Sequence, residues 1–380
     1  MSHSLLGALV LYNMNVLSLF DGMSCGQIAL IELGLVIDNY YASEIDKFAI
    51  KQTQLNFPKT TQLGSVTEWQ TWPIDWSSID LICAGSPCQG FSFAGKQLAF
   101  DDPRSKLFFV FVEILNHCRK FNPDVKFLLE NVDMKKDHLR IISKYVGIFP
   151  VKINSTLVSA QNRERWYWTN IKTKQVGLFD ELYTDIPQPY DEGILLRDIL
   201  QPENEVDQKY WLSDDAVKYL HRTKMNERFI QNENELKGGC ITANYRKGIP
   251  YNVMQLNPSL ESGGKQPYQQ NRIYSDEGKS TALMAELSCG SNAVYLSEPR
   301  HKHGENRYYE DKAPTIQARY GTGGDNIPYV NNLRRLTPVE CSRLQTIPAW
   351  YKWECSDSQI YRMIGNGWTV KVIQHIFSFI

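Results

Sequence analysis

The stretch Asp80-Leu-Ile-Cys-Ala-Gly85, followed by Ser86-Pro87-Cys88-Gln89, decides the fold class of this 380-residue chain. The apolar run is short and does not alternate with polar residues, which is typical of a central strand in a parallel sheet. Pro87 ends the strand because proline lacks the N–H that strand pairing needs. In open α/β sheets, ligands bind at such strand ends. The segment predicts an exposed thiol at Cys88, although taken alone it fits a small buried cysteine equally well.

The flanking segments alternate between strand-like and helix-like patterns. We expect strands over residues 15–20, 36–43, 80–84 and 126–130. One helix is expected to end at Gly34, and two others to cover residues 47–56 and 106–119. A final β-rich stretch covers residues 151–170. Alternation of this kind predicts an α/β fold with a doubly wound sheet.

The chain divides into three segments. Residues 1–174 form the predicted α/β domain, residues 175–330 a smaller second domain, and residues 331–380 a return to the first. The middle segment is polar, rich in glycine and asparagine, and contains short β-prone runs. A helical segment is expected from Leu333, followed by an apolar tail suited to burial. Met14 directly precedes the first strand, which leaves open that residues 1–13 are a dispensable extension.

Composition and charge exclude several classes of protein. The apolar and charged fractions, 42% and 22%, are those of a globular chain and exclude a disordered or fibrous one. A net charge of −1 argues against a uniformly basic nucleic-acid binder. The eight cysteines contain no Cys-x-x-Cys pair and no zinc-like spacing, so reduced thiols and no metal are expected. The N-terminal apolar stretch is short and lacks a basic start, so we expect a cytoplasmic protein with no membrane partner.

Phe20-Asp-Gly-Met-Ser-Cys-Gly26 lies between the first strand and its helix, and Glu44 follows the next strand. Small residues let a ligand approach the backbone, and a helix N-terminus offers free N–H groups. An acidic side chain one strand further on can bind ribose hydroxyls. The full G-x-G-x-x-G fingerprint is absent, which disfavours a dinucleotide. The pattern indicates a nucleoside cofactor, with a simple tight turn as the alternative.

Three further motifs carry polar groups. Glu130 is an awkward charge on an apolar strand unless it faces a ligand, where its carboxyl could carry a proton; capping of the next helix is the alternative. Gln161, Arg163 and Arg165 alternate and therefore share one strand face, where the arginines could hold a carbonyl oxygen and a phosphate. A surface salt-bridge ladder is the alternative there. Gly365-Asn366-Gly367 is a tight turn or a helix entry.

Taken together and in order, the motifs resemble those of the DNA cytosine-5 methyltransferases. They are Phe20-x-Gly22, Pro87-Cys88-Gln89-Gly-Phe-Ser92, Glu130-Asn-Val132, Gln161-x-Arg163-x-Arg165, Arg335-Leu-Thr-Pro-x-Glu340 and Gly365-Asn366-Gly367. The segment between residues 170 and 331 sits where that family carries its variable target-recognition domain. The resemblance implies a Rossmann-like S-adenosylmethionine-dependent methyltransferase domain with a smaller, β-rich target-recognition domain, in a prokaryotic or phage-type enzyme.

The resemblance also implies a mechanism on a cytosine flipped out of duplex DNA. The Cys88 thiolate would add to C6 while Glu130 protonates N3, and C5 would then take the methyl group. Arg165 would bind the cytosine O2, Arg163 would help to fix the site, and Pro87 would shape the loop. The cofactor, S-adenosyl-L-methionine, would be surrounded by Phe20, Asp21, Gly22, Ser24, Glu44, Ile45, Val66 and Asn366.

The chain departs from the family pattern around the cofactor. Asp21 and Ser24 stand where many members have alanine or glycine, and Ser65 stands where an aspartate often contacts the adenine amino group. Neither departure touches the catalytic set. Six side chains suit phosphates or base edges and are candidate DNA contacts: Gln89, Ser92, Thr242, Arg246, Thr315 and Arg319. For the threonines, a purely structural role is the alternative.

Two other functions remain open from the sequence. One branch of the same family methylates tRNA with the same Pro-Cys motif, so tRNA cytosine-5 methylation is an alternative. A non-catalytic DNA-binding regulator is another, although such proteins tend to lose the nucleophile that Cys88 provides. Duplex DNA is the expected partner. A restriction endonuclease acting on the same site, within a restriction-modification system, is a further candidate partner.

Overall fold

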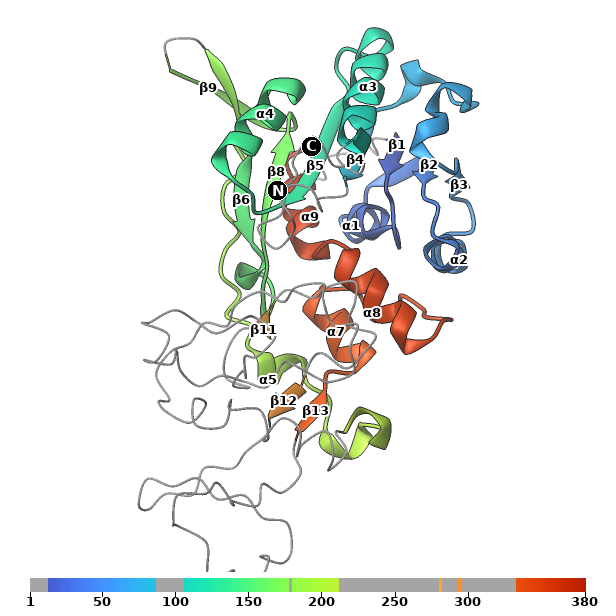
Figure 1. Cartoon of the computed structure of the whole chain (residues 1–380), viewed down its shortest axis with the longest axis vertical. Helices are drawn as coiled ribbons and strands as arrows, with labels where there is room; N and C mark the ends of the chain where they lie inside the picture. The colour runs from blue at the N-terminus through green and yellow to red at the C-terminus, as the bar shows by residue number, and fades with distance from the viewer. Residues whose placement is uncertain (1–12, 87–105, 178–179, 212–279, 282–292, 296–332) are drawn as a thin grey trace, which may run out of the picture.

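A computed structural model describes residues 13–86, 106–177, 180–211, 280–281, 293–295 and 333–380 (Figure 1). Its centre is a seven-stranded sheet with the strand order β3-β2-β1-β4-β5-β8-β6. The strands are β1 (Asn13–Leu19), β2 (Val36–Ser43), β3 (Thr61–Gln62), β4 (Leu81–Gly85), β5 (Lys126–Val132), β6 (Val151–Asn154) and β8 (Glu164–Thr169). The helices around it are α1 (Cys25–Glu32), α2 (Lys47–Asn56), α3 (Lys106–Phe121), α4 (Lys136–Val146), α5 (Leu196–Ile199), α7 (Pro338–Leu344), α8 (Asp357–Asn366) and α9 (Val370–Phe377).

The direction of the strands brings the functional motifs to one edge of the sheet. Strands β1 to β5 pair in parallel, so their carboxyl ends lie together. Strand β8 runs antiparallel to both of its neighbours, β5 and β6. Its first residues therefore meet the last residues of β5, and Arg165 pairs with Val132. The predicted α/β fold is confirmed, and the antiparallel β8 is an addition that the sequence did not indicate.

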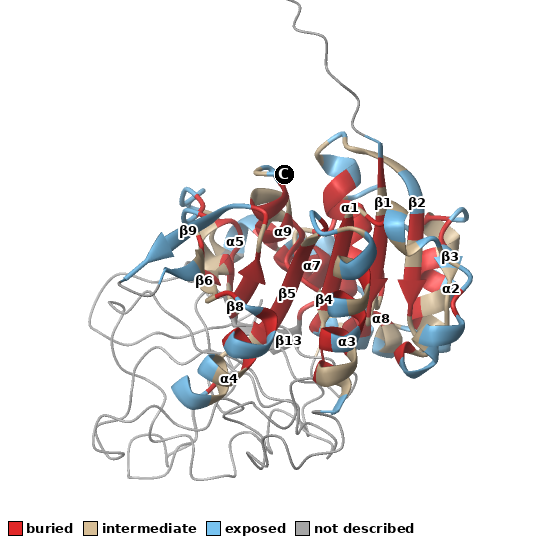
Figure 2. Cartoon of the chain, turned by 90° about the horizontal axis from the view of Figure 1, so that it is seen from above, coloured by how far each residue is buried: buried red, intermediate tan, exposed pale blue. Residues whose placement is uncertain are grey.

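Helices cover both faces of the sheet (Figure 2), and the residues of β4 show why. All of Leu81, Ile82, Cys83 and Ala84 are buried. Leu81 and Cys83 belong to the core cluster that includes α1, α8 and α9, whereas Ile82 and Ala84 belong to the cluster formed with α3 and α4. Successive side chains of a strand point to opposite faces, so a strand without polar residues needs a cover on each.

Local signals explain where the helices begin and end. Helix α1 stops before Gly34, whose left-handed φ of 73° lets its N–H bond to the carbonyl of Ile31. The predicted helix from Leu333 is wrong in its start. Residues Leu333–Arg335 form β13, which pairs antiparallel with β12 (Ala293–Tyr295). Helix α7 begins at Pro338, because Thr337 and Glu340 form a capping box around its first turn.

The C-terminal segment contributes α9 to the helices that pack around the main sheet. Helix α9 packs on α1, and its apolar residues from Val370 to Phe377 are buried. Further short strands lie outside the main sheet: β7 (Gln161–Asn162) pairs with β11 (Ser280–Thr281), and β9 (Thr173–Val176) with β10 (Glu181–Thr184). Within the described ranges, no helix is long and apolar enough to cross a membrane.

Candidate active site

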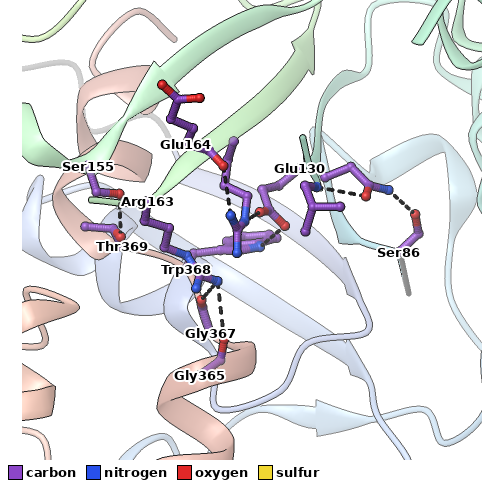
Figure 3. Close-up of polar contacts among 12 residues, drawn as sticks. Ser86, Glu130, Ser155, Arg163, Glu164, Gly365, Gly367, Trp368 and Thr369 are labelled. Carbon is purple, nitrogen blue, oxygen red and sulfur yellow. Dashed lines mark hydrogen bonds and ion pairs between the residues drawn. The ribbon is translucent and has the colours of Figure 1, made fainter. Parts of the chain in front are cut away.

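The end of β4 leads into the predicted catalytic loop. Ser86 follows the strand, is buried, and accepts a 3.2 Å hydrogen bond from Nδ2 of Asn131 on β5 (Figure 3). The Oδ1 atom of Asn131 in turn accepts the N–H of Val132, at 2.9 Å. This amide fixes the chain just ahead of Pro87 and Cys88 beside the strand that carries Glu130.

Glu130 is buried, with only 8% of its surface exposed, and each carboxylate oxygen has a side-chain partner. The Nε atom of Arg165 lies 2.9 Å from Oε1, and the indole Nε1 of Trp368 donates to Oε2 at 3.2 Å (Figure 3). A buried charge is tolerated only when it is paired and hydrogen-bonded. Helix α4 begins at Lys136 with Lys135 as its N-cap, so the alternative that Glu130 caps this helix is wrong.

Gln161, Arg163 and Arg165 are all buried, but no single strand carries them, because β7 ends at Asn162 and β8 begins at Glu164. The arginines are only 3% and 6% exposed, which rules out a surface salt-bridge ladder. Arg165 also donates from Nη1 to the carbonyl of Glu164, at 2.8 Å. Arg163 donates from Nη2 to the carbonyls of Gly365 and Gly367, at 3.3 and 2.9 Å. Arg163 therefore holds the glycine turn before α9 against the strand.

Two further buried side chains, which the sequence did not single out, contact this group of residues. Gln345 donates from Nε2 to the carbonyls of Ile364 and Gly367, at 2.7 and 3.0 Å. Its Oε1 accepts from Gln161 and Thr369, at 2.9 and 2.8 Å. Trp368, the other, directly follows the glycine turn. Proximity to that turn is the only sequence signal that could have suggested Trp368, and none could have suggested Gln345.

The loop between β1 and α1 is held in an unusual backbone conformation. Phe20, Gly22 and Ser24 all have left-handed φ angles, of 57°, 61° and 65°. Such a conformation costs energy at Phe20 and Ser24 and is typical of functional sites. A Cβ added to Gly22 would meet nothing within 4 Å. The backbone at Gly22 therefore faces open space at the strand edge.

Glu44 supports this loop from the end of β2. Its Oε2 accepts the N–H of Gly22 at 2.8 Å, and its Oε1 accepts those of Ile45 and Asp46 at 2.7 and 2.8 Å. The neighbouring Ile45 is 76% exposed, which is unusual for a large apolar side chain. A carboxylate and an exposed apolar side chain thus stand together beside Gly22.

Asp21 has a role that the sequence did not indicate. Its half-buried carboxylate accepts from Tyr40 Oη, at 2.8 Å, and from Ser24 Oγ. The pKa of Asp21 is raised to about 6, because burial and, to a smaller extent, the charge of Glu44 outweigh the hydrogen bonds from Ser18, Ser24 and Tyr40, which lower it. Within the described structure Asp21 ties the loop to β2 and to the start of α1.

Other predicted residues lie around the same edge. Val66 is buried in the core cluster on the α3 side. Ser65 accepts the N–H of Thr67 and caps the short 3-10 helix η1 (Val66–Thr71). Asn366 is exposed at the end of α8. The remaining predicted residues fall outside the described residues: Pro87, Cys88, Gln89, Ser92, Thr242, Arg246, Thr315 and Arg319.

The described cysteines and acidic groups do not offer a competing site. Burial raises the pKa of the Cys25 thiol to about 12 and that of Cys118 to about 11, and it also raises that of Cys83. Only a thiolate is a good nucleophile, so these three are unsuited to that role. In the described part of the chain, no group of three or more His, Cys, Asp or Glu residues could hold a metal ion.

The strand order with one antiparallel strand near the edge, and polar groups gathered at the strand ends, define a Rossmann-like methyltransferase. A family model described as C-5 cytosine-specific DNA methylase matches residues 14–380. The chain therefore belongs to this family, and it is a DNA (cytosine-5-)-methyltransferase.

Curated relatives agree with this assignment, and solved structures agree with the fold. The orphan methyltransferase M.SPRI of Bacillus phage SPR is 28% identical over 439 residues, with 96% of each chain covered. The type II methyltransferase M.HpaII of Haemophilus parainfluenzae is 29% identical, covering 94% of this chain and 86% of its own. The fold is similar to that of the S. pombe Dnmt2 methyltransferase, with a TM-score of 0.57, 17% identity and coverage of 96% and 97%. The Entamoeba histolytica methyltransferase EhMeth has a similar fold, with a TM-score of 0.60 and 14% identity, and the match covers 97% of this chain and 98% of that one.

Proposed function

We propose that this enzyme transfers a methyl group from S-adenosylmethionine to C5 of a flipped-out cytosine in a specific duplex DNA sequence. The reaction would proceed through a covalent bond between Cys88 and C6 of the base. The observation that carries this proposal is the buried Glu130 carboxylate, held between Arg165 and Trp368 at the edge where β4 leads into Pro87 and Cys88. A target atom inside the base stack is out of reach, so the base must leave the duplex.

The residues at the ends of β1 and β2 fit the proposed cofactor. The Glu44 carboxylate suits ribose hydroxyls, exposed Ile45 suits the face of an adenine, and the open backbone at Gly22 allows close approach. Phe20, Asp21 and Ser24 shape this loop, and Val66 and Asn366 are proposed as further cofactor contacts. When bound, S-adenosylmethionine supplies an electrophilic methyl group.

The side chains would act on the base in a fixed order. The Cys88 thiolate forms a bond to C6 as the C5–C6 double bond gives up its electron pair, while Glu130 delivers a proton to N3. Arg165, which already lies against Glu130, donates to the cytosine O2. After C5 has gained the methyl group, its proton passes to water. The Cys88–C6 bond then breaks, which restores the C5–C6 double bond and frees the thiolate, and N3 returns its proton to Glu130.

DNA recognition is proposed for the segment 175–330, between the two parts of the catalytic domain, residues 1–174 and 331–380. The candidate contacts there are Thr242, Arg246, Thr315 and Arg319, with Gln89 and Ser92 in the catalytic loop. Type II and orphan enzymes both occur among the relatives. A cognate restriction endonuclease is therefore proposed as a partner in function, and an endonuclease that cuts the same DNA sequence would be the evidence for it.

Transfer of labelled methyl from S-adenosylmethionine tests the proposed function. Mixed-sequence duplex DNA and unmodified tRNA would be offered to the wild type and to Cys88→Ser, and the DNA would then be sequenced after bisulfite treatment. We expect 5-methylcytosine in one short DNA context and no transfer by the variant. Transfer to tRNA alone would refute the DNA substrate. Binding of cofactor and DNA by a folded wild type with no transfer to either nucleic acid would favour the non-catalytic regulator.

A further inference from the structure

Trp368 occupies a slot that two glycines leave open. A Cβ added to Gly85, the last residue of β4, would lie 3.0 Å from Nε1 of the indole and 3.4 Å from two of its ring carbons. A Cβ added to Gly26 on α1 would lie 3.4 Å from Cζ3. The 3.0 Å contact at Gly85 is tighter than ordinary van der Waals packing, whereas the contacts at 3.4 Å are ordinary. The missing side chain at Gly85 is therefore what lets the ring lie against the end of β4, with Gly26 in contact on the α1 side.

The slot aims the indole N–H at Glu130. Trp368 is only 8% exposed and donates to Oε2, while Arg165 lies on Oε1. Two donors on different oxygens fix the plane of the carboxyl group, and a remaining lone pair can carry the proton that is delivered to N3. Arg163 holds the backbone just before Trp368 through the carbonyl of Gly367. The position of the indole ring is thus fixed both by the backbone contact at Gly367 and by the hydrogen bond of its N–H to Glu130.

We propose that Trp368 is a positioning residue that orients the Glu130 carboxyl toward the flipped cytosine through its indole N–H. This inference rests on the proposed function, because it assigns a partner to the group that protonates N3. When the flipped cytosine binds, its N3 takes up a position beside Glu130, and Arg165 turns from Glu130 to the cytosine O2. The indole N–H then becomes the donor that keeps the carboxyl in place during addition of Cys88.

The sharpest test replaces Trp368 with an analogue in which sulfur takes the place of the ring N–H, so that shape is retained and only the donor is lost. A hydrogen bond to a charged group contributes enough to change a rate by about 10- to 100-fold. We expect kcat to fall by about that factor, with KM for DNA changed by less than about threefold. The affinity for S-adenosylhomocysteine, measured by calorimetry, should stay equally close to that of the wild type.

A second readout isolates the addition step. Hydrogen exchange at cytosine C5, followed with S-adenosylhomocysteine in place of the methyl donor, needs Cys88 and Glu130 but no methyl transfer. It should fall in parallel with kcat. The matched control is the same analogue at Trp350, whose indole donates to Glu32 at 2.7 Å on the exposed surface. That enzyme should keep wild-type rates.

Gly85→Ala provides an independent approach, since its Cβ would displace the indole without altering it. In a double-mutant cycle, Gly85→Ala should lower kcat in the wild type and have little further effect in Trp368→Phe. Wild-type kcat in the sulfur analogue would refute the proposal, as would a loss of cofactor affinity equal to the loss of kcat. A wild type that transfers no methyl to DNA would overturn the proposed function, and this inference with it.

Discussion

Glu44 and Glu130 stand at the same edge of the sheet but are held in opposite ways. Glu44 accepts three backbone N–H groups, two of which belong to the residues that directly follow it. Glu130 relies on side chains, Arg165 on the neighbouring strand and Trp368 in the C-terminal segment. A backbone N–H is lost only on substitution by proline, whereas a side-chain donor is lost on most substitutions.

The difference suggests a division of tasks. A carboxylate held by backbone groups stays in one position, which suits the binding of a cofactor that is used unchanged for every DNA sequence. A carboxylate held by an arginine can exchange that partner for a base when the base arrives. Under the proposed function, the Glu44 side of the site would bind the cofactor, and the Glu130 side would change partners during the reaction.

The largest effect expected from this comparison is that of Glu130→Gln. The amide cannot deliver a proton to N3, and general acid catalysis contributes about 10²- to 10⁴-fold, so kcat should fall by that range. The affinity for S-adenosylhomocysteine should not change. Steady-state methylation and calorimetry would measure the two. Urea unfolding is the necessary control, since an unpaired Arg165 charge could destabilise the fold.

Glu44→Gln should show the opposite division. Loss of a charged acceptor for ribose hydroxyls costs about 1.5–3 kcal/mol, so the Kd for the cofactor should rise by about 10- to 100-fold. At saturating cofactor, kcat should remain within about threefold of the wild type, because uniform binding does not lower the barrier. If Glu44→Gln lowered kcat as strongly as Glu130→Gln does, the two carboxylates would not differ in the way proposed.

The same contrast marks the limit of what the sequence could predict. Strand β2 and helix α2 have the predicted bounds, because apolar periodicity and capping residues such as Asp46 are local signals. Glu44 was found for the same reason, since its place at the end of β2 follows from the strand itself. The break between β7 and β8 at Arg163 was not predicted, because the alternation of Gln161, Arg163 and Arg165 alone reads as one continuous strand.

Contacts between distant segments could not be predicted. Trp368 is 238 residues from Glu130 in the sequence, and Gln345 is 184 residues from Gln161. The antiparallel direction of β8 belongs in this group, because it depends on pairing with β5 rather than on the residues of β8. The helix expected from Leu333 failed similarly, since pairing with β12 extends these residues.

Asp21 is a third carboxyl at this edge, and it should give the smallest effect. It differs from the other two because its donors are hydroxyl groups, and burial raises its pKa from 3.8 to about 6. The folded state therefore binds this proton more tightly than the unfolded chain does. Its contribution to stability is present below pH 3.8 and is lost as the pH rises to about 6.

Asp21→Asn should remove this pH dependence. The free energy of unfolding of the variant minus that of the wild type, measured in urea, should increase by about 1–2 kcal/mol from pH 4 to pH 7. This is less than the full pKa shift implies, because the side chain is half-buried. Asp75→Asn is the control of opposite sign. Hydrogen bonds from Ser77 lower the pKa of exposed Asp75, so this variant should be less stable than the wild type at pH 7 and approach it below pH 3.8. If the stability of Asp21→Asn depended on pH as that of the wild type does, ionisation of the Asp21 carboxyl would not destabilise the fold. The loop would then depend on its left-handed backbone rather than on this side chain.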